Sequence, residues 1–87
     1  MADSLRLDLF LKMSRLIKRR TVAKALCDAG RVQINGRDAK AGTEVRVGDR
    51  LGLALAQGRI EATVLRLPQR IEGPDGIVSI ESERAQP

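Results

Sequence analysis

The sequence predicts an α+β fold in which two N-terminal helices precede a small, mostly antiparallel, hairpin-rich sheet. Three observations lead to this prediction. Apolar residues recur at helical spacing as far as Ala29, the spacing changes to two after Gly30, and Asn35-Gly36 is the strongest short signal for a hairpin turn. A chain of 87 residues is expected to form one domain with one modest core.

The first helix is expected over residues 7–14. The apolar residues at i, i+3 and i+4 that share one face are Leu7, Phe10 and Leu11. Ser4 lies just upstream, where its side chain can cap the helix, and Asp8 in the first turn favours the positive end of the helix dipole. Phe10 is the only aromatic residue of the chain, and we expect it in the core.

A second helix is expected over residues 18–29. Its predicted apolar face consists of Val22, Leu26 and Ala29. Gly30 follows the last periodic residue and is expected to end the helix in the left-handed conformation. Cys27 is the only cysteine and the chain has no histidine, so neither a disulfide nor a zinc site is expected. We expect Cys27 to be a small apolar helix residue, and we expect no cofactor.

Beyond Gly30 the sequence predicts short strands joined by turns. Val32 and Ile34 alternate with polar residues before the Asn35-Gly36 turn, whereas the returning segment 37–42 is a weak strand former. Further along, Val45 and Val47 alternate again. These segments predict a hairpin and then a further strand.

The remaining strands are expected on either side of two more turns. Gly48-Asp49 is the first of these turns, and Gln57-Gly58 separates two strands that end at Pro68. We expect residues 1–67 to form the domain with its sheet. Residues 68–87 are expected to form a loop, a short strand over 77–80 and a flexible polar tail that is frayed.

Positive charge is concentrated in the first half of the chain. The net charge is +5, but residues 1–50 carry twelve Lys or Arg and six Asp or Glu, a net of +6, whereas residues 51–87 carry four and five, a net of −1. Residues 12–24 contain six basic residues and no acidic one. A helix face that meets only solvent normally mixes both signs, so this segment predicts a polyanionic partner.

The cluster lies where a second helix would begin. A helix N-terminus presents unpaired backbone amides and positive partial charge, so Lys18, Arg19 and Arg20 would strengthen a phosphate site there. Each exposed cation disfavours the isolated helix by roughly 0.3 to 1 kcal/mol, because it faces the positive end of the dipole. A bound polyanion would offset this cost.

Several function classes can be weighed from these residues. Catalysis is disfavoured by the absence of histidine and of a phosphate-cradling glycine motif, so we expect no enzyme. A membrane-surface helix would need a broad apolar face that the basic segment lacks. No apolar run approaches about 20 residues and the start does not resemble a signal peptide, so we expect a cytoplasmic protein without a membrane partner.

Nucleic acid is the favoured partner. The chain has no Trp or Tyr on which to stack splayed bases, so recognition of a folded RNA through phosphates and 2′-hydroxyls is preferred. A helix-turn-helix DNA-binding regulator stays open, because two successive helices look similar at this level. A module that binds an acidic protein also stays open.

Residues 6–51 closely resemble the S4 domain, an RNA-binding domain named after ribosomal small-subunit protein four. The resemblance is carried by the runs R-L-D-x-F-L, S-R-x-x-K-R-R-T and G-R-V-x-I-N-G. It implies RNA binding and the fold known as the αL RNA-binding motif, with two helices before a hairpin-rich sheet. Among stand-alone members, the length and the segments K-M-S-R-L-I-K-R-R-T and V-G-D-R-L are most similar to the RqcP family of bacterial ribosome-associated quality control.

This resemblance implies specific partners. They are rRNA and peptidyl-tRNA on a large ribosomal subunit left after a stalled ribosome splits, together with an RqcH-type tailing factor that adds alanines to the nascent chain. The alternative is the heat-shock protein fifteen type, which also binds obstructed large subunits. That type usually carries a longer basic tail, whereas this chain ends in an acidic one. We expect a monomer.

The family's RNA contacts are carried over residue by residue. They fall on Arg6, Arg15, Lys18, Arg19 and Arg20, with Lys24, Arg31, Arg37 and Lys40 as further candidates. The resemblance implies that Asp8 either orients Arg6 or serves only as a first-turn carboxylate. Leu9 departs from the family, in which a lysine commonly follows the aspartate, so any contact from that position is lost.

Overall fold

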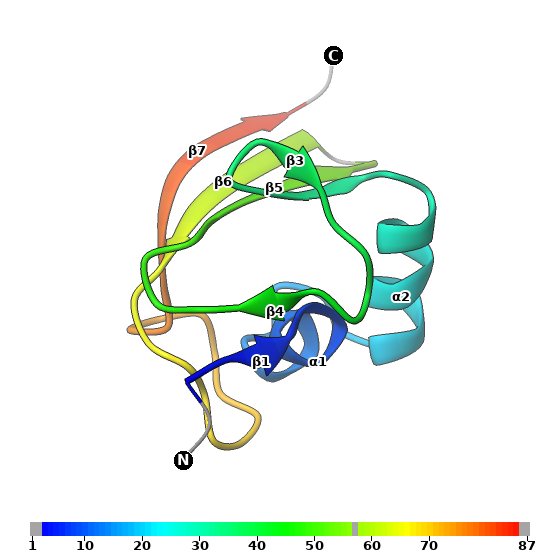
Figure 1. The fold of residues 1–87 in the computed structure, drawn as a ribbon. Coiled ribbons are helices and arrows are strands. Elements are labelled where there is room, and N and C mark those ends of the chain that lie inside the picture. The colour runs from blue at the N-terminus through cyan, green and yellow to red at the C-terminus, as the bar shows by residue number, and fades with distance from the viewer. Residues whose placement is uncertain (1–2, 57, 86–87) are drawn as a thin grey trace.

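The computed structural model describes residues 3–56 and 58–85 and confirms the predicted α+β fold. Figure 1 shows the two helices at one side and one end of a curved antiparallel sheet. The helices are α1 (Leu7–Met13) and α2 (Arg20–Asp28). The strands are β1 (Leu5–Arg6), β2 (Val32–Ile34), β3 (Arg37–Asp38), β4 (Glu44–Val45), β5 (Arg50–Leu55), β6 (Gly58–Val64) and β7 (Val78–Ala85).

The strands form two separate sheets. Five strands pair antiparallel in the order β3-β2-β5-β6-β7, and β1 pairs with β4 in a second, two-stranded sheet. A register shift between Glu61 and Ala62 interrupts the pairing of β6 with β7. Because β1 leads directly into α1, the small sheet fixes the start of that helix next to the segment before β5.

The core lies between the helices and the five-stranded sheet. The largest fully buried side chains include Phe10 and Leu11 from α1, Leu51 and Leu53 from β5, and Ile77 just before β7. The predictions that Phe10 lies in the core and that Leu7, Phe10 and Leu11 form the inner face of the first helix are confirmed. Burying these side chains is the main source of stability in a domain of this size.

Helix α1 begins without a side-chain cap, so the predicted role of Ser4 is wrong. Arg6 occupies the N-cap position, and no side chain makes a capping hydrogen bond there. The first backbone amides are satisfied from across the small sheet instead, since Leu7 N donates to Thr43 O at 2.8 Å and Asp8 N donates to Ala41 O at 3.1 Å. Tertiary pairing replaces the local cap.

Helix α2 is shorter than predicted, and of its predicted apolar face only Leu26 packs against the core, where it is partly buried. Residues 18 and 19 precede it, and its inward side chains are the small residues Ala23 and Cys27, whereas Val22 is 46% exposed and Ala29 is exposed. Small side chains let α2 approach the core closely, so the bulkier Val22 was wrongly assigned to the buried face. The role of Cys27 as a small apolar helix residue is confirmed.

The end of α2 follows the prediction. Gly30 has φ +73°, and its amide donates to Cys27 O at 3.0 Å. Arg31 N donates to Leu26 O at 2.9 Å. These two bonds form a Schellman motif, for which a glycine in the left-handed conformation is preferred.

The predicted hairpin is confirmed. Asn35 and Gly36 have φ values of +53° and +84°, as a type I′ turn requires, and Ile34 pairs with Arg37 across it. The Asn35 side chain also donates to Asp49 Oδ1 at 3.1 Å and accepts from Arg50 N at 3.0 Å. The hairpin is thereby tied to the turn that precedes β5.

Two sheet predictions are corrected. Val47 is 60% exposed in a turn, because β4 ends at Val45, so the expected longer alternating strand does not form. The strand expected over 77–80 is β7, which begins at Val78 and extends along β6 to Ala85, five residues beyond the predicted end. Gln57 and the tail residues 86 and 87 lie outside the described residues.

Candidate nucleic-acid interface

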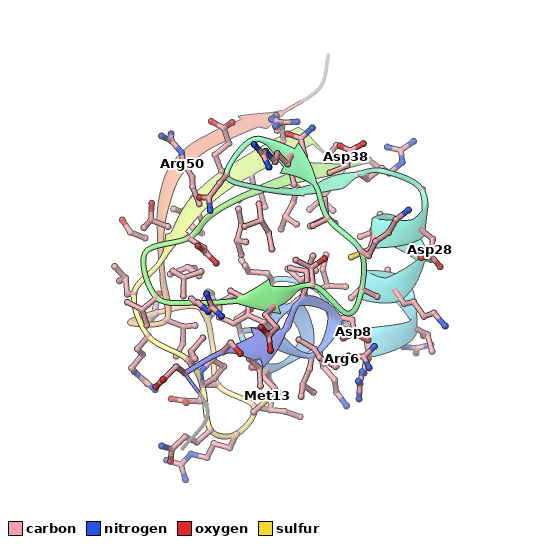
Figure 2. The ribbon with its side chains drawn as sticks, in the orientation of Figure 1. Arg6, Asp8, Met13, Asp28, Asp38 and Arg50 are labelled. Carbon is pink, nitrogen blue, oxygen red and sulfur yellow. The ribbon has the colours of Figure 1, made fainter. Side chains whose placement is uncertain are left out.

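A buried carboxylate connects two of the predicted site arginines. Asp8, in the first turn of α1, is 3% exposed, and its Oδ2 accepts from Arg20 Nε at 3.1 Å while its Oδ1 accepts from Arg6 Nε at 3.2 Å. Leu9 N also donates to Asp8 Oδ1 at 2.9 Å. Figure 2 shows Arg6 and Asp8 close together beside the lower end of α2. Asp8 therefore orients Arg6, which is one of the two roles predicted for this carboxylate.

The pairing keeps Asp8 ionised. Burial acts to raise its pKa, but the hydrogen bonds from Arg20 and Arg6 outweigh burial and hold the pKa below its ordinary value of 3.8. The three groups together carry one net positive charge. Arg20 uses only Nε toward Asp8, so its two terminal nitrogens remain available as donors for a phosphate.

Four other predicted cations, from the segment between the helices and from α2 itself, have no such partners. Within the described residues, no carboxylate pairs with the side chains of Arg15, Lys18, Arg19 or Lys24, and all four are exposed. Arg19 is the N-cap residue of α2, whose first turn contains no acidic residue. The positive charge of these side chains therefore adds to that of the helix end.

Arg15 is held in a strained backbone conformation. It follows the C-cap residue of α1 with φ +59°, which side chains other than glycine and asparagine rarely adopt. Its amide donates to Lys12 O at 3.0 Å, and Ile17, two residues later, is buried and bonded to Leu11 O. The turn after α1 is therefore tied back to that helix at residues 15 and 17, and Lys18 follows directly.

Two hollows adjoin this surface. One, of about 420 Å³, is lined by Lys12, Arg15, Leu16, Lys18 and Ile71. The other is an apolar groove of about 480 Å³ along α2, bordered by Lys18 and Arg31. Lys18 contributes to both, so it lies at the point where they approach each other. Arg31 lies at the end of α2 away from Arg19 and Arg20.

The structure does not bring every predicted cation together. Arg37 belongs to β3, and Figure 2 shows its neighbour Asp38 at the opposite end of the molecule from Arg6. Lys40 is exposed in the segment between β3 and β4, and its backbone amide donates to Thr43 Oγ1 at 2.9 Å. Arg37 thus lies apart from the cations around the start of α2.

Sequence reasoning missed three contributors to this region. The pairing of Arg20 with Asp8 spans 12 positions and had no local signal. Lys12 was counted in the basic run but not as a site residue. Ile71 comes from a loop more than 50 residues further along the chain, and only the folded structure places it beside Lys12.

Other kinds of site find little support in the part of the chain that the structure describes. No group of three or more metal-binding side chains is found in that part. Burial, followed by the charges of Asp8 and Asp28, raises the pKa of the Cys27 thiol to about 11, which makes it a poor nucleophile. Neither helix has the length and apolar character needed to span a bilayer.

Comparisons with known proteins identify the family of the chain. A family model of the S4 domain matches residues 5–51. The RQC P-site tRNA stabilizing factor of Halalkalibacterium halodurans is 40% identical over 83 residues, covering 95% of this chain and 94% of that protein. The protein of the same name from Bacillus subtilis is 51% identical over 63 residues, covering 72% and 73%.

Two solved structures are similar in fold. The trimeric structure of Vibrio cholerae Heat Shock Protein 15 superposes with a TM-score of 0.83 at 22% identity, covering 91% of this chain and 83% of that one. A hypothetical protein solved in solution superposes with a TM-score of 0.73 at 33% identity, covering 92% and 100%. Because each likeness covers more than 90% of this chain, it extends beyond residues 5–51, which the family model matches.

Proposed function

This chain belongs to the S4 domain family, and on that premise we propose that it binds rRNA and P-site tRNA on large ribosomal subunits that still carry a stalled nascent chain. By holding the tRNA it would support an RqcH-type factor that adds alanines to that chain. The proposal includes a cytoplasmic, non-catalytic role as a monomer. It is supported by the names of relatives that are 40% and 51% identical to this chain.

One observation carries the proposal. Exposed cations without carboxylate partners among the described residues lie between the helices and on α2, next to two arginines fixed by one buried carboxylate. Rigid placement lowers the entropy cost of binding a phosphate backbone. Phe10 is fully buried and the sequence has no other aromatic residue, so recognition rests on backbone contacts rather than base stacking.

The test compares two charge reversals at separate places on the surface. Lys18→Glu changes an unpaired cation beside α2, whereas Arg46→Glu makes the same charge change in the turn after β4, where Arg46 pairs with Glu44 at 3.6 Å. Co-sedimentation with large subunits carrying P-site tRNA should weaken at least tenfold for Lys18→Glu and little for Arg46→Glu, roughly as expected for losing a phosphate contact.

Competitors then separate the alternatives. Free duplex DNA should compete poorly, and empty large subunits should bind more weakly than those with P-site tRNA. A preference for duplex DNA would favour a DNA-binding regulator instead. Equal weakening by both charge reversals would show that net charge alone drives the association, and the proposed site would be wrong.

Arg20 is a poorer choice for this test. A glutamate at position 20 would lie against the buried Asp8 carboxylate in place of its Arg20 partner. Two neighbouring carboxylates, of which that of Asp8 is buried, would repel each other. A loss of binding by Arg20→Glu would then report on folding as well as on RNA contact.

A further inference from the structure

The hollow of about 420 Å³ joins two parts of the chain that are far apart in sequence. Lys12, Arg15, Leu16 and Lys18 come from the end of α1 and the turn after it, and Ile71 comes from the loop between β6 and β7. That loop lies outside residues 5–51, which the S4 domain model matches. The hollow is therefore formed partly by the matched domain and partly by a loop outside the matched residues.

The loop is fixed in place by backbone hydrogen bonds and by the burial of Pro68. Glu72 N donates to Met13 O at 2.7 Å, which ties the loop to the last turn of α1. Pro68 is buried, and at the far end Leu65 N donates to Ile77 O at 2.7 Å. Ile71, between these anchors, is nevertheless 51% exposed, so its position beside the hollow is not explained by core packing.

The charge in the hollow is positive. Within the described residues, no carboxylate pairs with Lys12, Arg15 or Lys18. Glu72 follows Ile71 directly, but its carboxylate accepts from Arg66 Nη2 at 2.6 Å and from Arg66 Nη1 at 3.2 Å. Arg66 therefore neutralises the nearest acidic group of the loop.

We infer that this hollow binds one unpaired nucleotide that projects from a folded RNA, an inference that rests on the RNA binding proposed above. Lys12, Arg15 and Lys18 would contact its phosphate, and the base or ribose would pack between Leu16 and Ile71. A phosphate alone needs cations but no apolar wall. An apolar ligand alone would not need three cations. The volume of the hollow, about 420 Å³, lies in the range of small-ligand sites.

The experiment uses two RNA hairpins and two matched variants. One hairpin is fully paired, and the other is identical except for a single bulged nucleotide. Ile71→Ser removes the apolar wall. Val47→Ser also replaces an exposed β-branched apolar side chain by serine, at a position that is 60% exposed and does not line the hollow. Both positions lie on the surface, and thermal melting of each variant checks the fold.

The unaltered chain should bind the bulged hairpin about fivefold more tightly than the paired one, the effect of burying part of one apolar side chain. Ile71→Ser should abolish this preference while leaving affinity for the paired hairpin unchanged, and Val47→Ser should keep it. Equal binding of both hairpins by the unaltered chain would overturn the inference but leave the proposed function intact. Failure of the unaltered chain to bind large ribosomal subunits would instead refute the proposed function.

Arg66 is a positioning residue in this scheme, and its role has a separate test. Arg66→Ala would free the Glu72 carboxylate beside the cations and should weaken binding of both hairpins. The double variant Arg66→Ala with Glu72→Gln has the charge of the unaltered chain and should restore binding. If Arg66 only braces the loop, the double variant will stay as weak as the single one, and the electrostatic part of the inference is wrong.

Discussion

Replacing Arg19 by aspartate should stabilise the protein and weaken its RNA binding at the same time. Arg19 is the N-cap residue of α2, with φ −128° and ψ 138°, and no side chain caps the helix. Aspartate is among the preferred residues at this position, because its carboxylate accepts from the second or third backbone amide of the helix. The Arg19 side chain has no hydrogen-bond acceptor, so it cannot make this bond.

The size of the effect follows from two contributions. A new side-chain cap is worth about 1 kcal/mol. Removing a cation from the positive end of the helix and placing an anion there contributes about 0.3 to 1 kcal/mol for each change. The sum is about 2 kcal/mol, which corresponds to a rise of about 10 °C in Tm for a domain of this size.

Two measurements on Arg19→Asp check the reasoning. Thermal unfolding followed by circular dichroism should show the higher Tm, and filter binding at several salt concentrations should show affinity at least tenfold lower. The slope of log affinity against log salt should fall by about 0.7 to 0.9 for the lost phosphate contact. Arg46→Asp is the charge-matched control. A raised Tm with unchanged affinity would remove Arg19 from the interface, and a lowered Tm would refute the capping argument.

Three further predictions concern single side chains. Asp8→Asn should reduce the free energy of unfolding by about 1 to 2 kcal/mol at pH 7. Because the pKa of Asp8 is lowered in the folded protein, its contribution to stability is present above pH 3.8 and is lost as the pH falls further. Urea unfolding should therefore show that the variant loses less stability on acidification than the unaltered protein does. Arg15→Gly should weaken RNA binding severalfold without lowering Tm, because glycine relieves the strain at φ +59°; a lowered Tm would contradict this. Cys27 should resist iodoacetamide at pH 8 until the protein unfolds, and rapid labelling of the folded protein would show that its pKa is not raised to about 11.

Much of the fold could be predicted because its signals are local. The i, i+3, i+4 spacing of Leu7, Phe10 and Leu11 indicates the first helix, and Gly30 marks the end of the second. Asn35-Gly36 specifies a type I′ turn, because both positions need a positive φ. Each signal depends on residues within a few positions of one another. These predictions were correct wherever no distant segment competed.

The errors arose where a distant segment supplied the interaction. The start of α1 is satisfied by carbonyl groups of residues 41 and 43, so Ser4 is not needed. The strand β7 gains its hydrogen bonds from β6, although its polar sequence gives little strand signal. In α2 the neighbouring core selects the small side chains of Ala23 and Cys27, which a count of large apolar residues does not favour.

The basic cluster was located from composition, but its organisation depends on Asp8. That carboxylate joins Arg6, just after β1 pairs with β4, to Arg20, the first residue of α2. A contact between the two helices therefore also sets the position of the Arg20 guanidinium, and the same carboxylate holds that of Arg6. RNA that binds these groups would favour the folded arrangement, since a ligand that binds only the native state stabilises it. Mutual repulsion among the neighbouring cations acts against folding of the free protein. The same charges attract RNA, so they make folding less favourable without RNA and more favourable with it.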